Sequence, residues 1–134
     1  MREFNTGATR DSDAGKNDYD GFLSPLVLEK YGNYMNKHRV QADGKLRDSD
    51  NWQKGFGDNH FDVCRKSLWR HFIDFWAISR GYIRYDKKDG HKIDIIEAGC
   101  AILFNVMAYM HIYLKDEKRP DPNECDNCPL KEGD

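Results

Sequence analysis

Residues 94–105 have the sequence Asp-Ile-Ile-Glu-Ala-Gly-Cys-Ala-Ile-Leu-Phe-Asn, and this stretch decides the fold. Each helical residue turns about 100°, so positions three, four or seven apart share a face. The stretch belongs to a predicted helix of about residues 91–118 that is apolar almost all round, which is typical of a buried helix. One stripe holds Asp94, Glu97, Ala101 and Asn105, and a roughly opposite apolar stripe holds Ile96, Cys100, Leu103, Met107, Met110 and Leu114.

Two carboxylates, Asp94 and Glu97, lie one turn apart on this mostly buried helix. Removing a carboxylate from water is unfavourable unless it is paired, hydrogen-bonded or bound to a metal. The two like charges also repel each other. The sequence therefore predicts either a cation between them or a basic side chain that covers them.

Composition limits the class of protein. The 134 residues suffice for one domain with a modest core. The net charge of -2 argues against general nucleic-acid binding, which usually shows as a basic excess. The longest nearly apolar run, residues 98–110, suits a core helix, so we expect no membrane partner. Four cysteines without a secretion signal predict reduced thiols in a cytoplasm.

The chain divides into three parts: a polar N-terminal arm (1–22), an all-α domain (23–118) and a disordered acidic tail (119–134). In the arm, Gly15-Lys16 suggests a phosphate loop, but Arg10 stands where that loop needs glycine. Two interpretations remain open: a flexible polar arm, or an arm whose Arg10 and Lys16 fold over an anionic ligand. In the tail, Cys125 and Cys128 form half of a tetrahedral zinc site, so a zinc or redox role is a weaker alternative.

Two further helices are expected before the last one. The first spans about residues 25–38 with Ser24 as its N-cap, and the second about residues 59–80 with Asp58 as its N-cap. The loop between them contains Trp52 and Lys54. Trp52 either anchors this loop on the domain or stacks on a base, in which case Lys54 would reach a phosphate.

The second helix carries its own polar pair, His71 and Asp74, one turn apart. A short charged linker joins it to the last helix, so the two helices should pack antiparallel and bring this pair opposite Asp94 and Glu97. Magnesium and manganese take oxygen ligands, and manganese also accepts imidazole. The alternative is that basic side chains neutralise these groups, for example in an Arg70–Asp74 surface pair.

The helix pair resembles the all-α nucleoside triphosphate pyrophosphohydrolases of the MazG and dimeric dUTPase group. A closer resemblance is to the phage dATP/dGTP diphosphohydrolase N-terminal domain family, which includes MazZ proteins. It covers about residues 4–114 and rests on four blocks: Gly7-Ala-Thr-Arg10-Asp11-Ser-x-x-Gly15-Lys16, Asn51-Trp52-x-Lys54-Gly55, Arg70-His71, and the small-residue helix that ends in Asn105.

The resemblance implies a MazG-like helical bundle that hydrolyses a purine deoxynucleoside triphosphate to the monophosphate and pyrophosphate, with Mg²⁺ or Mn²⁺. It implies metal ligands at His71, Asp74, Asp94 and Glu97, of which His71, Asp94 and Glu97 are also catalytic. It implies substrate contacts from Arg10, Lys16, Trp52, Lys54, Arg70 and Asn105. The chain departs from the pattern, because His71 and Asp74 stand where related enzymes carry glutamates.

A second hypothesis is a catalytically silent helical module that binds a nucleotide or a protein. Both hypotheses predict a homo-oligomer, a dimer or tetramer, because so few helices rarely cover their own aromatic faces. The resemblance implies a location in the cytoplasm of a phage-infected host cell.

Overall fold

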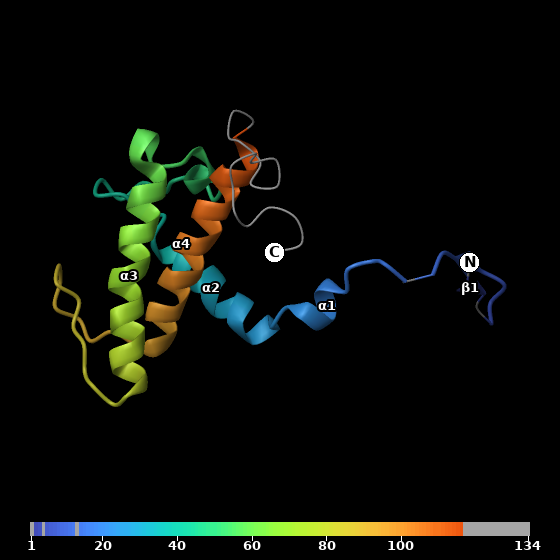
Figure 1. The fold of residues 1–134 in the computed structure, drawn as a ribbon, viewed down its shortest axis with the longest axis horizontal. Coiled ribbons are helices and arrows are strands. Elements are labelled where there is room, and N and C mark those ends of the chain that lie inside the picture. Colours follow the sequence, from blue (N-terminus) through green and yellow to red (C-terminus); the bar gives the residue numbers. More distant parts are fainter. Residues whose placement is uncertain (1, 4, 13, 117–134) are drawn as a thin grey trace, which may run out of the picture.

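The computed structural model describes residues 2–3, 5–12 and 14–116, and it is mostly helical, which confirms the all-α class (Figure 1). The elements are β1 (Arg2–Glu3), β2 (Thr9–Arg10), α1 (Tyr19–Phe22), α2 (Pro25–Lys37), η1 (Asn51–Lys54), η2 (Gly57–Asn59), α3 (His60–Ser79) and α4 (Ile95–Lys115). β1 and β2 pair as a two-stranded antiparallel sheet. The predictions for the tail, including Cys125 and Cys128, lie outside the described residues.

Helix α4 is the centre of the fold, since α3, α2 and η1 all pack against it (Figure 1). A row of small or polar side chains on α4 is buried: Ala98, Ala101, Asn105 and Ala108. Small side chains let α3 and α4 approach closely, and Phe75 of α3 lies against Gly99. Cys64 and Cys100 are both free and buried, as their helical positions suggest.

The opposite face of α4 is exposed, so the expectation of a helix buried all round was wrong. Five apolar side chains form this α4 apolar stripe, with exposed fractions as follows: Ile96 49%, Leu103 44%, Met107 44%, Met110 54% and Leu114 78%. α2 covers α4 only in part, for example where the Tyr31 hydroxyl lies 3.9 Å from the Met107 sulfur. Among the described helices, α4 is the one whose length and composition would suit a bilayer, a test that core helices of soluble proteins also pass.

The predicted helix boundaries hold at α2 and shift at α3 and α4. Ser24 caps α2 by accepting a hydrogen bond from the Val27 N–H at 3.3 Å, as predicted. α3 begins at His60 after a 3-10 turn, so the prediction of Asp58 as its N-cap was wrong. α4 begins at Ile95 rather than near residue 91, because residues 84–93 fold back on themselves: the Ile93 N–H donates to the Arg84 carbonyl at 2.9 Å.

A buried histidine fixes the loop before α3 against α4. His60 Nδ1 accepts from the Phe56 N–H at 3.1 Å, so Nε2 carries the proton that it donates to the Ala108 carbonyl at 2.9 Å. Gly55 has φ +80°, and a Cβ there would lie 3.3 Å from His60 Nδ1. This position therefore requires glycine.

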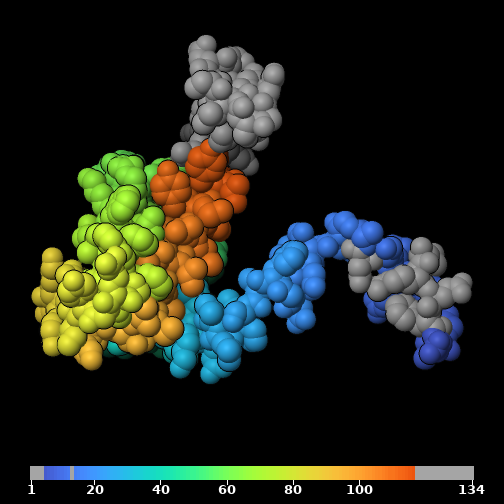
Figure 2. Space-filling view, turned by 60° about the horizontal axis from the view of Figure 1, so that its bottom comes forward, coloured from blue at the N-terminus to red at the C-terminus, as the bar shows by residue number. Residues whose placement is uncertain are grey.

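The N-terminal arm extends away from the helices in both views (Figures 1 and 2). β1 and β2 contact only each other, and α1 contacts none of the other described elements. Arg10 and Lys16 are both exposed. In this structure the arm therefore lies apart from the helix pair (Figure 1), and the interpretation in which Arg10 and Lys16 fold over an anionic ligand stays a prediction.

Candidate functional site

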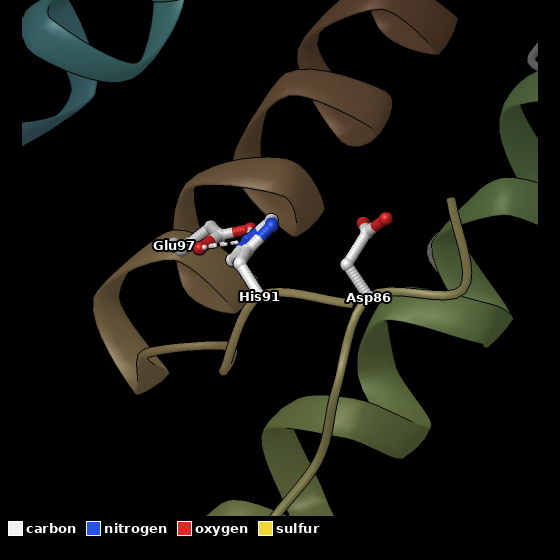
Figure 3. A group of neighbouring side chains, drawn as sticks. All are labelled: Asp86, His91 and Glu97. Carbon is white, nitrogen blue, oxygen red and sulfur yellow. Dashed lines mark hydrogen bonds and ion pairs between the residues drawn. The ribbon is translucent and has the colours of Figure 1, made fainter. Parts of the chain in front are cut away.

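Three potential metal ligands converge where the linker meets α4: Asp86, His91 and Glu97 (Figure 3). All three are half-buried, and one ligand atom from each lies within 4.8 Å of the others. We call them the acid–histidine group. Glu97 comes from the first turn of α4, whereas Asp86 and His91 come from the linker after α3.

The linker brings Asp86 and His91 together because it is a tight hairpin. An antiparallel bridge joins Tyr85 to Lys92, and the Asp86 N–H donates to the His91 carbonyl at 2.8 Å. The Asp86 side chain accepts from the backbone N–H groups of Lys88 and Asp89 at 2.8 and 3.2 Å, which closes the turn.

His91 lies between two carboxylates. Its Nε2 lies 2.8 and 3.0 Å from the two carboxylate oxygens of Glu97, and its Nδ1 bonds to Asp89. The bond to Glu97, followed by that to Asp89, raises the pKa of His91 above its ordinary value of 6.5. Both ring nitrogens of His91 face carboxylates, so this arrangement favours the protonated imidazolium, which can donate from both nitrogens.

A second set of ionisable groups, His71 and Asp74 of α3 and Arg84 of the linker, lies near the acid–histidine group. Arg84 Nε donates to Asp74 Oδ1 at 3.0 Å, and the Asp74 side chain is only 18% exposed. Burial lowers the pKa of His71, and the nearby charge of Asp74 opposes this, with smaller opposing effects from Glu97 and Asp86. His71 is thus a mainly neutral imidazole beside a cluster of carboxylates.

Of the predicted metal ligands, His71 lies within electrostatic reach of Asp74 and Glu97, whereas Asp94 has another role. Asp94 is exposed and caps α4 by accepting from the Ile96 N–H at 3.1 Å. Its expected place on a buried stripe was wrong, because the helix starts one residue after it. The alternative of a basic side chain that neutralises Asp74 is met by Arg84, and the Arg70–Asp74 pair given as an example does not appear among the described ion pairs.

The predicted substrate-binding residues are dispersed. Arg70 and Lys54 are exposed, and Asn105 is buried and donates to the Ala101 carbonyl of its own helix at 2.8 Å. Trp52 packs edge-to-face on Phe104 and His111 at centroid distances of 6.1 and 5.2 Å, which fits the interpretation as an anchor.

Sequence reasoning missed Asp86, His91 and Arg84, because it treated the linker as a charged connection. One signal was present: Asp89-Gly90 predicts a turn, and a turn there places the residues before and after it face to face. Gly90 has φ +74°, as such a turn requires.

The acid–histidine group offers the kinds of ligand atom that a hard divalent ion takes. Its spacing of up to 4.8 Å is slightly wider than the roughly 4.2 Å between opposite ligands of an ion bound at about 2.1 Å. A small movement of these half-buried side chains would bring the three ligand atoms within binding distance of one ion. Two carboxylates and an imidazole suit manganese, and the remaining coordination positions would be free for water or substrate.

No protein-family model, curated protein or solved structure matches this chain. The resemblance described above therefore stays an expectation.

Proposed function

We propose that this protein hydrolyses a purine deoxynucleoside triphosphate to the monophosphate and pyrophosphate, with Mg²⁺ or Mn²⁺ as cofactor. The observation that carries the proposal is the convergence of Asp86, His91 and Glu97 beside His71 and Asp74. The resemblance to the phage diphosphohydrolase family supplies the reaction class. In this proposal α3 and α4 are the antiparallel pair of a MazG-like bundle.

The proposed ligands are Asp86, His91 and Glu97. A bound ion would neutralise phosphate charge and lower the pKa of a coordinated water. Asp89 orients His91, and Arg84 holds Asp74 at the edge of the group. His71, kept neutral by burial, is the proposed acceptor of a proton from the attacking water.

The same proposal includes a homo-oligomer in the cytoplasm of a phage-infected host cell. The exposed α4 apolar stripe supports the oligomer, because such a face is normally covered by another chain. The proposed partner is the nucleotide substrate, and the proposal includes no nucleic-acid or membrane partner.

One observation favours the alternative of a silent binding module. His91 pairs with Glu97, and Arg84 pairs with Asp74, so much of the cluster's charge is balanced by protein groups alone. In that case the cluster would be a structural network at the end of the helix pair.

The test is pyrophosphate release from the four dNTPs and four NTPs with Mg²⁺ and Mn²⁺ in parallel. We expect metal-dependent release that is highest with purine deoxynucleotides and falls by about 10²-fold or more in Glu97→Gln. Asp62→Asn is the matched control, since Asp62 is an exposed carboxylate paired with Arg65 outside the site.

Thermal unfolding of Glu97→Gln separates the two hypotheses. An enzyme with Glu97 as a metal ligand loses turnover and keeps its fold. A folded wild-type protein that releases no pyrophosphate from any nucleotide, together with a marked loss of thermal stability in Glu97→Gln, would instead identify a binding module.

A further inference from the structure

A second concave site lies beside α4, apart from the acid–histidine group. It is a cavity of about 580 Å³ between the end of α2, the loop at residues 38–49, η1 and Phe104 of α4. This volume is within the range of small-molecule sites in proteins. Phe104 follows Glu97 by seven residues, so the two share a face of α4 about 10 Å apart along its axis.

Four aromatic side chains line the cavity together with smaller and polar residues: Tyr34, Trp52, Phe56 and Phe104. Phe104 meets Trp52 and Phe56 edge-to-face, at centroid distances of 6.1 and 6.3 Å. Phe56 also stacks on the buried His60 ring at 5.4 Å and 14°. Because His60 is itself hydrogen-bonded at both nitrogens, these rings form a pre-ordered surface for another flat ring.

Two arginines line the same cavity from facing strands of a hairpin. The Arg47 N–H donates to the Arg39 carbonyl at 2.8 Å, and Val40 bridges Leu46. Arg39 Nε donates to the Arg47 carbonyl at 2.8 Å, and Arg39 Nη1 donates to Asn36 Oδ1 at 3.2 Å.

Arg47 Nη1 donates to the His38 carbonyl at 3.2 Å. Neither guanidinium forms an ion pair in the described part of the chain, although Asp48 also lines the cavity. Two neighbouring guanidinium groups held by neutral acceptors favour an anion, which they bind with strong charge-assisted hydrogen bonds.

We propose that this aromatic–arginine pocket binds the base and nearest phosphate of a nucleotide, with the base against Trp52 and Phe56 and the phosphate on Arg39 and Arg47. The flat walls select a planar ring and the two arginines select an anion, and a nucleotide is the abundant metabolite that combines both. The choice of a nucleotide as ligand rests on the proposed function. The pocket would hold the base end of that nucleotide, and the acid–histidine group would hold the metal near its other phosphates.

Calorimetry with deoxyguanosine monophosphate tests the proposal, using the full chain in EDTA so that no metal contributes. We expect binding to the wild type, and weakening by about tenfold or more in Arg47→Gln through loss of charge-assisted hydrogen bonds. Lys45→Gln is the control, because Lys45 is exposed on the same hairpin and does not line the pocket; it should bind like the wild type.

Two comparison ligands test the two halves of the site. Deoxyguanosine lacks the anion and inorganic pyrophosphate lacks the ring, so both should bind more weakly than the nucleotide. No nucleotide binding in EDTA, unchanged affinity in Arg47→Gln, or pyrophosphate binding as tightly as the nucleotide would each overturn the proposal.

These results are independent of catalysis. Nucleotide binding that depends on Arg47 supports the pocket even if no variant releases pyrophosphate, in which case only the proposed reaction fails. Pyrophosphate release combined with unchanged nucleotide affinity in Arg47→Gln would overturn the pocket and leave the reaction standing.

Discussion

At the scale of single residues, His91 couples the linker to α4. Glu97 bonds to one of its ring nitrogens and Asp89 to the other, and together they raise its pKa. His71 has the opposite shift, because burial lowers its pKa. The pKa values of these two histidines are thus shifted in opposite directions, so their contributions to pH-dependent stability have opposite signs.

The raised pKa of His91 predicts a pH-dependent contribution to stability. A group whose pKa is higher in the folded state stabilises the fold fully below its unfolded pKa, here 6.5, and loses that effect as pH rises through the folded pKa. We expect His91→Gln to lower the thermal midpoint more at about pH 5.5 than at about pH 8.5. Thermal scans of both proteins across this range measure the difference. A difference that stays constant or grows with pH contradicts the assignment.

At the scale of elements, the helices were largely predictable and the site only in part. Ser24-Pro25 correctly marks the start of α2. Helical periodicity puts His71 and Asp74 one turn apart on α3, and in the structure the charges of Asp74 and Glu97 both act on His71. Periodicity could not place Asp86 or His91, because their positions depend on a turn and not on a repeating pattern.

The two faces of α4 show a second limit of prediction from the sequence. Periodicity separates the two stripes of the helix but does not say which of them meets α3. The side with Ala101 and Ala108 does so, because small side chains allow close packing, while the larger apolar side chains face outward. The sequence had predicted both faces of this helix to be buried.

Close packing of α3 on α4 predicts that a larger side chain at Ala108 is destabilising. Ala108 is 0% exposed and its carbonyl accepts from His60. Ala108→Leu should reduce the free energy of unfolding by about 1–3 kcal/mol through overpacking. Urea unfolding measures this, with Met110→Leu on the exposed face as a control that stays near the wild type. An Ala108→Leu protein as stable as the wild type would show that the helices do not meet there.

At the scale of the whole molecule, the chain leaves much apolar surface uncovered. Besides the α4 apolar stripe, the outer face of α3 exposes Trp69 by 61%, Phe72 by 42% and Trp76 by 51%. Faces that expose several large apolar side chains are typical of surfaces that another chain covers. A second copy of the chain is the occupant that we propose for these faces.

This proposal predicts a dimer or tetramer in detergent-free buffer. Sedimentation equilibrium should give two or four times the chain mass of 15.7 kDa. Replacing Leu103 and Met110 with glutamate should lower the association state, because each charge would have to be buried at the interface. Lys30→Glu on α2 controls for the added charge, since Lys30 is exposed and polar in the wild type. A wild type that sediments as a monomer would contradict the oligomer.

The central claim, that Asp86, His91 and Glu97 form a divalent-metal site, is tested most directly by titrating Mn²⁺ into the protein and following the free ion by electron paramagnetic resonance. The titration belongs at about pH 8, where a larger share of His91 is deprotonated and able to ligate. We predict stoichiometric loss of the free Mn²⁺ signal with the wild type and with Asp62→Asn, and a signal that persists with His91→Gln and Glu97→Gln. A wild-type protein that leaves Mn²⁺ free, or a Glu97→Gln protein that binds it equally well, would contradict the account.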